Sequence, residues 1–287
     1  GTTFKEISGK TLSNVELPLP PLAEQQRIVA KLDAAFAEID RAIEATHEQL
    51  KSSSSIALAW LKTKFAQDEA VSKTLSLCVG MPTTKPKDGW KWHKLTDIAK
   101  LESGHTPSRR HPEYWGGDIK WVGIKDARKN HAGVIFDTEQ KTNELGIKNS
   151  SARLLPKDTV CLSRTASVGY VFRLGESMAT SQDFINWVCT SSLQPDFLQL
   201  LFLAEGEAIK RFGSGAIHKT IYFDTAKEFH VCVPSLERQH EIVSAYTPLI
   251  ENANKVIEFT EEKGVALTSL KSAILAQELQ PPQSEAA

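Results

Sequence analysis

Two stretches of the chain repeat one another. The first reads Pro20-Pro21-Leu22-Ala23-Glu24-Gln25-Gln26-Arg27-Ile28-Val29, and the second reads Pro234-Ser235-Leu236-Glu237-Arg238-Gln239-His240-Glu241-Ile242-Val243. Pro, Leu, Gln, Ile and Val recur at an offset of 214 residues (234 − 20). Upstream, the alternation of Val15, Leu17 and Leu19 matches that of Phe229, Val231 and Val233, which is typical of a half-buried strand. Each copy therefore predicts a strand, a proline break and a long helix.

The helix expected in each copy carries residues that step alternately by three and four, which is the heptad pattern of a coiled coil. We expect these helices at about 22–67 and 235–279, each about 65–70 Å long and in need of a partner along its apolar stripe. Mutual coiled-coil packing is favoured, and separate packing of each helix on a globular core is the alternative. The seam positions are Val29, Leu32, Phe36, Ile39, Ile43, Thr46 and Leu50 in the first copy, and Val243, Tyr246, Ile250, Ala253, Ile257, Thr260 and Gly264 in the second. Thr46, Thr260 and Gly264 weaken the seam, where they would fix its register or allow close approach of the backbones.

The segment between the helices, about 73–233, has a different character. It begins with a turn-rich stretch at residues 80–89 that is typical of a linker, and short apolar runs then alternate with turn signals. This pattern predicts a mixed α/β domain of about 160 residues. The candidate strands are Ile119–Ile124, Thr159–Ser163, Gly169–Arg173 and Ile185–Thr190, and the candidate helical segments are Phe197–Gly206 and Glu207–Phe212.

Charge is unevenly distributed along the chain, although 34 Lys and Arg against 35 Asp and Glu leave a net charge of only −1. Residues 1–72 hold 8 basic and 10 acidic side chains (−2), residues 73–233 hold 22 and 17 (+5), and residues 234–287 hold 4 and 8 (−4). A basic middle domain between acidic helices favours nucleic-acid binding by that domain, but an excess of five charges is modest.

Three loops of the middle segment combine cations, hydroxyl groups and turn-forming residues, at 103–111, 163–167 and 213–220. Such loops can present guanidinium groups to phosphates or to guanine edges. The alternative is that they are solvated turns with incidental charge. Trp115, Trp121 and Trp187 lie in apolar runs, so we expect them in the core rather than as platforms for stacked bases.

Several protein classes are disfavoured by motifs that the sequence lacks. No run of about 18 uncharged apolar residues is present to span a membrane, and no signal-peptide pattern opens the chain. No GxxxxGK[ST], GxGxxG, GxSxG, HExxH or Asn/Asp-Pro-Pro-aromatic motif occurs, so no catalytic residue is predicted. Cys78, Cys161, Cys189 and Cys232 form no CxxC, so neither a zinc site nor a disulfide framework is expected.

Three stretches, taken together, are specific to a known family. They are the repeated helix start at 20–29 and 234–243, the run from Gly89-Trp90-Lys91-Trp92 through Ser103-Gly104-His105-Thr106-Pro107-Ser108 to Tyr114–Val122, and Leu155-Pro156-Lys157-Asp158 with Ser163–Gly169. With these stretches the chain resembles, over essentially its whole length, the specificity (S) subunits of type I restriction–modification systems. Two departures are mild: Ser235 replaces the second proline, and His240 stands where Gln26 does.

The resemblance implies an α+β architecture, in which a mixed α/β target recognition domain accompanies two long helices that form an antiparallel coiled coil. It divides the chain into the tail of a preceding recognition domain (1–19), a conserved long helix (20–72), the target recognition domain (73–233) and a second conserved long helix (234–287). Such a subunit reads one half of a bipartite DNA site and scaffolds the methyltransferase and restriction subunits. The alternatives are a coiled-coil scaffold or adaptor without DNA binding, and the recognition half of a single-chain restriction–methylation enzyme.

The resemblance also implies partners and a cytoplasmic location. We expect double-stranded DNA, methyltransferase (M) subunits and a restriction (R) subunit as partners, and no membrane. Catalysis, with S-adenosylmethionine, ATP and Mg, would lie in the partner subunits, so this chain would itself be no enzyme and would hold no cofactor or metal. We interpret the chain as a cut or permuted half of a two-domain subunit, with a natural half subunit as the alternative, and expect it to form a homodimer or to pair with another half subunit.

The site residues follow from the loops and from the heptad seam. We expect DNA contacts from Thr106, Ser108, Arg109, Arg110, Arg164, Ser214, His218 and Lys219. We expect the helix-pair interface to contain Val29, Leu32, Phe36, Ile39, Ile43, Leu50, Val243, Tyr246, Ile250 and Ile257. Loop geometry decides which base edge each side chain meets, so neither the recognised bases nor the spacer length follow from the sequence.

Overall fold

The computed structural model describes residues 9–15, 19–66, 79–80, 85–165, 167–215 and 219–280. Parts of the expected preceding-domain tail (1–8 and 16–18) and linker (81–84) therefore lie outside the described residues, as does Cys78. The chain forms two compact units, one comprising Gly1–Ser54 with Asn254–Ala287 and the other Ser55–Ala253. Long helices and three β-sheets confirm the expected mixed fold class.

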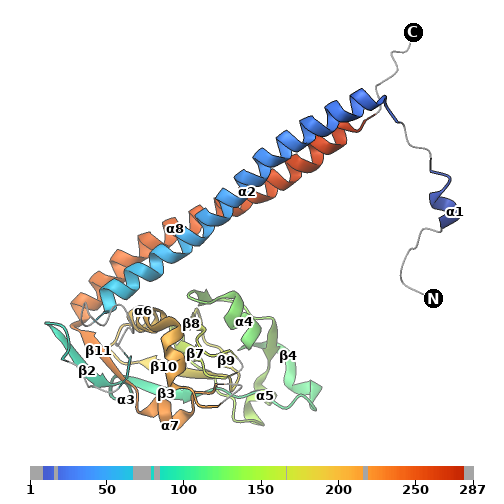
Figure 1. The fold of residues 1–287 in the computed structure, drawn as a ribbon. Coiled ribbons are helices and arrows are strands. Elements are labelled where there is room, and N and C mark those ends of the chain that lie inside the picture. Colours follow the sequence, from blue (N-terminus) through green and yellow to red (C-terminus); the bar gives the residue numbers. More distant parts are fainter. Residues whose placement is uncertain are drawn as a thin grey trace. The chain divides into compact units, whose positions relative to one another are not determined.

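The first unit contains most of two long helices, α2 (Leu22–Phe65) and α8 (Leu236–Glu278), which lie side by side in opposite directions (Figure 1). Lys31 Nζ is 2.5 Å from Glu278 Oε1, and Lys271 Nζ is 2.8 Å from Asp40 Oδ1. As the residue number rises along α2, the number of its partner on α8 falls, so the pair is antiparallel. A short helix, α1 (Gly9–Leu12), precedes α2.

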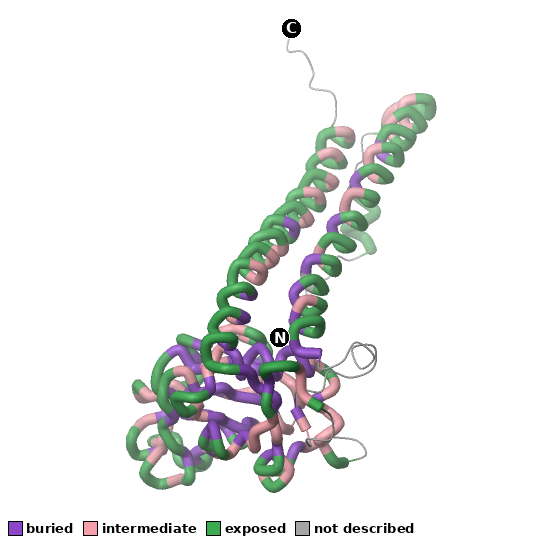
Figure 2. Tube along the Cα trace, turned by 90° about the vertical axis from the view of Figure 1, so that its left-hand side faces the viewer, coloured by how far each residue is buried: buried purple, intermediate pink, exposed green. Residues whose placement is uncertain are grey.

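Buried and half-buried positions recur along one stripe of each long helix (Figure 2). Thr46 and Thr260 are buried on this stripe, and each hydroxyl donates to the carbonyl four residues earlier, at 2.7 Å and 2.5 Å. The two polar side chains are therefore satisfied within their own helices. A Cβ added to Gly264 would lie 3.8 Å from Thr46 Cγ2, an ordinary contact distance, so close backbone approach does not require a glycine at this position.

Val29 departs from the interface positions expected from the heptad pattern. Its side chain is 55% exposed, whereas Ile28 is half-buried in its place. With about 100° of rotation per residue, Ile28 lies about 40° and Val29 about 60° from the direction of the buried Leu32, so Ile28 takes the inward position near the start of α2. Among the other expected positions, Leu32, Ile39 and Tyr246 are buried, and Phe36, Ile43, Leu50, Val243, Ile250 and Ile257 are half-buried.

Of the strands expected before the two long helices, the first falls partly on residues 16–18, outside the described residues, and the second is present. There β11 (His230–Pro234) pairs with β1 (Val79–Gly80) on one side and with β2 (Trp90–Lys94) on the other. In the first copy, the described residues Val15 and Leu19 belong to no strand and are exposed. An alternating apolar pattern forms a strand only where partner strands supply hydrogen bonds, and β1 and β2 supply them to β11.

The second unit is built on three sheets. The three-stranded sheet β1-β11-β2 is one of them, and the other two have the orders β3-β10-β7-β8-β5 and β6-β4-β9. The strands of the five-stranded sheet are β3 (Ala99–Ser103), β10 (Phe184–Cys189), β7 (Val160–Ser163), β8 (Val171–Leu174) and β5 (Val134–Ile135). Those of the remaining sheet are β6 (Gln140–Thr142), β4 (Trp115–Val122) and β9 (Ala179–Thr180).

Short helical segments connect these strands. They are α3 (Leu95–Ile98), η1 (Pro112–Tyr114), α4 (Ile124–Lys129), α5 (Glu144–Lys148), α6 (Pro195–Glu205), η2 (Gly206–Phe212) and α7 (Phe223–Lys227). The four candidate strands overlap β4, β7, β8 and β10, but Ile124 opens α4 instead of ending β4. The reason is the Asp126 carboxylate, which accepts a hydrogen bond of 2.9 Å from Gly123 N and so caps the start of the helix.

The core of the second unit includes the end of α2 and the start of α8. The Phe65 ring is fully buried, and its centroid lies 5.9 Å from that of Trp90 and 5.3 Å from that of Phe197. Gln239, 1% exposed, accepts a hydrogen bond at Oε1 from Gln194 N at 2.9 Å. Its Nε2 donates to Ser192 O and Pro234 O, so the amide anchors the first turn of α8 to the domain.

The repeated motif makes the same local contact in both copies. Gln25 Nε2 donates to Pro20 O at 2.7 Å, as Gln239 Nε2 donates to Pro234 O at 3.1 Å. In each copy the glutamine therefore ties the first helical turn to the proline that precedes it, which explains why Pro and Gln recur at this spacing.

We predict that Ile39→Ala lowers the free energy of unfolding by about 2 kcal/mol, because it removes a buried contact of the helix pair. Val29→Ala is the matched control, and a change within about 0.5 kcal/mol is expected for its exposed side chain. Urea unfolding followed by circular dichroism measures both values. Equal losses for the two variants would contradict the interface described here and favour the strict heptad.

Candidate functional site

Three loops leave the same edge of the five-stranded sheet. β3 and β7 both run antiparallel to β10, and the first residues of β10 pair with their last residues: Ile185 with Ser103, and Phe184 with Ser163. The loops after β3 and β7 therefore meet the loop before β10. We call this place the loop edge, formed by residues 104–111, 164–165, 167–170 and 180–183. The topology thus brings two of the three basic loops expected from the sequence together with a loop that was not expected.

The loops at 104–111 and 180–183 are in close contact. His105 N donates to Thr180 O at 2.9 Å, and Thr106 Oγ1 donates to Gln182 Oε1 at 2.5 Å. A Cβ on Gly104 would lie 2.1 Å from Ser181 O and 2.3 Å from Thr180 Oγ1. These distances are far below contact, so only glycine permits the approach that joins the two loops.

Arg164 joins the third basic loop to the loop edge. Its Nε donates to Gln182 O at 3.0 Å, and its Nη1 donates to Ile221 O at 3.2 Å. Its backbone bonds the same two segments, through Asp183 O and Ile221 N. The guanidinium also lies over the Phe223 ring, 5.0 Å from the centroid. Arg164, expected to contact DNA, is therefore placed to hold the loops in position.

Arg109 is held in a fixed direction although its side chain is exposed. The guanidinium carbon lies 3.7 Å from the centroid of the Trp115 ring, and Nη2 donates to Gln140 Oε1 at 2.5 Å. Stacking on an indole and an amide acceptor together restrict a side chain that is otherwise flexible. Trp121 packs edge-on against Trp115 and donates from Nε1 to His105 O at 3.0 Å.

The three tryptophans expected in the core differ in exposure. Trp187 and Trp121 are buried, whereas Trp115 is half-buried and carries the Arg109 guanidinium on its face. Trp115 is therefore not a full core residue, because its indole, at the first residue of β4, keeps one face available to a cation.

The remaining expected DNA-binding residues are exposed, except for His218, which lies outside the described residues. Ser108 Oγ accepts from Arg110 N at 3.4 Å. Ser214 and Thr220 form an antiparallel bridge, and Lys219 directly precedes Thr220. Thr220 Oγ1 is 3.3 Å from Thr165 Oγ1, so the Ser214–Thr220 bridge lies next to the loop edge.

Two glutamines of the site were not predicted from the sequence. Gln182 and Gln140 are exposed, and each uses its side-chain oxygen to accept from a residue that was predicted, Thr106 or Arg109. Neither glutamine adds charge to its loop, so a search for basic, hydroxyl-rich loops passes over both. Only the strand order, which brings 180–183 beside 104–111, provides a signal for Gln182.

Glu102, an acidic side chain next to the loop edge, is paired with two cations. Glu102 is buried on β3 and receives hydrogen bonds from Lys100 and Arg153. Burial raises the pKa of its carboxyl, but the two cationic donors outweigh burial and leave the pKa below its ordinary value. Glu102 is therefore ionised at neutral pH while its charge is balanced beside β3.

Neither a metal site nor a membrane-spanning helix is found in the part of the chain that the structure describes. No three or more His, Cys, Asp or Glu side chains within it are grouped closely enough to bind a metal ion. Likewise, none of the described helices combines the length and the apolar composition needed to cross a bilayer.

Comparison with known proteins gives a consistent family. The family model described as "Type I restriction modification DNA specificity domain" matches residues 1–51 and 87–264. The type I restriction enzyme EcoBI specificity subunit of Escherichia coli is 48% identical over 294 aligned residues, 96% of this chain and 60% of that protein. The MjaIX specificity subunit of Methanocaldococcus jannaschii is 33% identical over 187 residues, 63% of this chain and 43% of that protein.

Solved structures share the fold. A chain from a type I R-M system superposes with a TM-score of 0.75 at 18% identity, covering 98% of this chain and 65% of that one. The HsdS subunit from Thermoanaerobacter tengcongensis superposes with a TM-score of 0.56 at 19% identity, covering 97% of this chain and 64% of that one. The chain thus spans about two thirds of these structures, and between 41% and 60% of the EcoBI, MjaIX and HindI specificity subunits.

We predict that Gly104→Ala lowers the free energy of unfolding by about 1–3 kcal/mol, because the added methyl group forces the loops of the loop edge apart. Gly133→Ala is the control, since its Cβ would lie 3.4 Å from the nearest atom, Asn130 O. Urea titration of both variants tests this, and a Gly104→Ala variant as stable as Gly133→Ala would show that the contact between the loops is not required.

Proposed function

The chain belongs to the family of type I restriction modification DNA specificity domains, and we propose that its target recognition domain, residues 73–233, reads one half of a bipartite site in duplex DNA. The observation that carries this proposal is that Arg109, Gln182 and Thr106 meet at the loop edge, and that Lys219 lies beside the Ser214–Thr220 bridge next to it. Exposed guanidinium, amide, hydroxyl and ammonium groups are the donors and acceptors that proteins use on DNA.

The side chains of the site divide into two roles. The restricted guanidinium of Arg109 suits the O6 and N7 atoms of guanine, and the amides of Gln182 and Gln140 suit the N6 and N7 atoms of adenine. Arg110 and Lys219 are exposed cations suited to phosphates, which position the domain without reading bases. Arg164 supports both groups by fixing the loops through backbone carbonyls.

The second part of the proposal concerns the assembly. The chain would act in the cytoplasm as a specificity subunit that holds methyltransferase (M) subunits and a restriction (R) subunit on the DNA. S-adenosylmethionine, ATP and Mg would bind to those partners, and this chain would contribute recognition and no catalysis. Family membership supports this division, together with the acidic composition of the two segments that contain the long helices.

The third part of the proposal is that a second recognition domain packs against the first copy of the repeat. In the second copy Val233 is 6% exposed, Gln239 1% and Ile242 5%, because the recognition domain covers them. At the equivalent positions of the first copy, Leu19 is 81% exposed, and Gln25 and Ile28 are half-buried. We therefore propose that residues 19–28 receive a recognition domain from a second copy of this chain or from another half subunit.

Arg109→Ala is expected to weaken binding to the cognate duplex by about 1–3 kcal/mol and to relax specificity at one base pair, because it removes a base-reading group. Lys219→Ala should weaken all sequences alike and lower the salt slope by about one, because it removes a phosphate contact. Methylome mapping of cells carrying this chain with its partner subunits identifies the cognate duplex, and fluorescence anisotropy measures both variants on it.

Lys255→Ala, on an exposed face of α8, is the control for these measurements and should bind DNA as the unmodified chain does. Simultaneous replacement of Thr106, Ser108, Arg109 and Arg110 with unchanged DNA affinity would refute the assignment of the site. A chain with no salt-dependent DNA retention would instead be a scaffold.

Light scattering tests the pairing. The chain has a mass of 31.7 kDa, and we expect twice that mass at high protein concentration, either alone or after addition of another half subunit. Leu19→Asp should shift the equilibrium toward the monomer, because it places a charge on the exposed apolar position of the repeat. A strict monomer under both conditions would contradict the pairing.

A further inference from the structure

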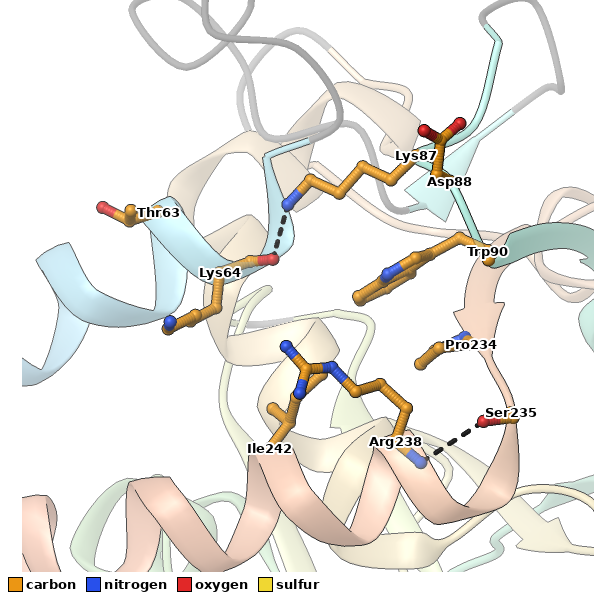
Figure 3. A pocket seen from close by; sticks show the side chains of 10 residues that line it. Thr63, Lys64, Lys87, Asp88, Trp90, Pro234, Ser235, Arg238 and Ile242 are labelled. Atoms are coloured by element: carbon orange, nitrogen blue, oxygen red, sulfur yellow. Dashed lines mark hydrogen bonds between the residues drawn. The ribbon is translucent and has the colours of Figure 1, made fainter.

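A cationic cavity of about 570 Å³ lies in the second unit, where the end of α2, the start of β2 and the start of α8 meet (Figure 3). We call it the cationic pocket, and it is lined by Lys64, Lys87, Trp90, Arg238 and Ile242, among others. Figure 3 shows the Arg238 guanidinium and the Trp90 ring projecting into the space between the two helix ends, with the two lysines at its rim.

Positive charge dominates the inner surface of this pocket. Lys87 Nζ donates to Lys64 O at 2.7 Å and lies 5.6 Å from the centroid of the Trp90 ring, so its ammonium group stays at the rim. Asp88 also belongs to the lining, but its carboxylate turns away from the cavity in Figure 3. Arg238 pairs with Glu241 one turn along α8, and both side chains are more than half exposed. An exposed pair of this kind contributes little, so an incoming carboxylate can replace Glu241.

The pocket lies at the opposite end of β10 from the loop edge. β10 begins at Phe184, beside the loop edge, and after its last residue, Cys189, the chain reaches Ser192 and Gln194, which bond Gln239 on the first turn of α8. Six residues of extended strand separate the two ends by about 20 Å. A duplex read by the loop edge would have to bend round the domain to reach Arg238, so the position favours a protein ligand over the recognised DNA.

The repeat provides a matched surface with the opposite charge. A second cavity, in the first unit, is lined by Pro20, Glu24, Ile28 and Glu278. At an offset of 214 these positions correspond to Pro234, Arg238, Ile242 and Lys64 of the cationic pocket. The proline and the isoleucine are kept, whereas both acidic positions become basic. The Glu24–Arg27 ion pair is likewise reversed to Arg238–Glu241.

We propose that the cationic pocket binds an acidic segment of a partner protein. A carboxylate lies between Arg238 and Lys64, where a guanidinium can bind it through two parallel hydrogen bonds. An apolar side chain of the same segment packs on Trp90 and Ile242, which form the apolar part of the lining. This inference rests on the proposed function for the identity of the partner, which is the methyltransferase subunit. The repeat-related cavity has carboxylates, Glu24 and Glu278, at the two positions where this segment requires cations.

Because the first copy of the repeat has glutamates at the positions equivalent to Lys64 and Arg238, it suggests a variant that tests the pocket. Lys64→Glu combined with Arg238→Glu gives the pocket the residues that the repeat already carries at Glu278 and Glu24, so the fold is expected to tolerate them. In calorimetric titration with the purified methyltransferase subunit, this double variant should bind at least about tenfold more weakly than the unmodified chain. Glu241→Gln should bind more tightly, because it frees Arg238 from its present partner.

The matched control reverses two cations outside the pocket. Arg41→Glu combined with Lys255→Glu, both exposed on the long helices, should leave the titration unchanged, and DNA retention should be the same for all variants. Unchanged binding of the Lys64→Glu/Arg238→Glu variant to the methyltransferase subunit would overturn the inference. A loss of DNA retention in that variant, with partner binding unchanged, would instead make the pocket a DNA contact and overturn it as well.

If the proposed function is wrong, the unmodified chain does not bind the methyltransferase subunit, which distinguishes this case from failure of the pocket alone. In that case a fluorescein-labelled peptide of glutamates flanking one phenylalanine tests the pocket by anisotropy. Binding to the unmodified chain, at least about tenfold weaker for the Lys64→Glu/Arg238→Glu variant, would support the pocket as a site for acidic segments. Superimposable curves for the two proteins, or no binding to either, would overturn it.

Discussion

The anchoring of both long helices in one hydrophobic core is the interaction on which the recognition domain depends. Phe65, at the last turn of α2, packs with Trp90 and Phe197, while Gln239, on the first turn of α8, satisfies the backbone of residues 192–194. A buried amide with three partners is costly to displace, because each backbone group it leaves would be unpaired in a dry environment. Together these contacts make two helix ends, 171 residues apart (236 − 65), part of a single domain.

Strand β10 lies between the two sites proposed for that domain. At its beginning, antiparallel pairing with β3 and β7 gathers the loops that carry Arg109, Thr106 and Gln182. At its other end it leads to the segment that bonds α8, beside the cationic pocket. The proposed DNA recognition and the proposed partner binding can therefore vary independently, since the loops and the helix ends belong to one domain but share no side chains.

The role of each charged side chain depends on where the fold places it. A net charge of −1 hides a recognition segment with an excess of five positive charges, and the cations inside and next to that segment have different roles. Arg164 donates hydrogen bonds to backbone carbonyls, and Arg109 stacks on the indole of Trp115. Arg238 and Lys64 line a cavity. The same residue type thus supports a loop, presents itself to a ligand or forms a pocket, according to its partners.

The sequence by itself determined the repeat, the two long helices, most of their buried stripe and the loops that supply the candidate site. These features follow from local periodicity and turn chemistry, which depend on residues close together in the chain. Only the tertiary structure decided that Val29 faces solvent, that Gln182 belongs with Thr106, that Arg164 is a support, and that Lys64 and Arg238 share a cavity. Each of these depends on strand order or helix pairing, which join residues distant in the sequence and leave no local pattern to read.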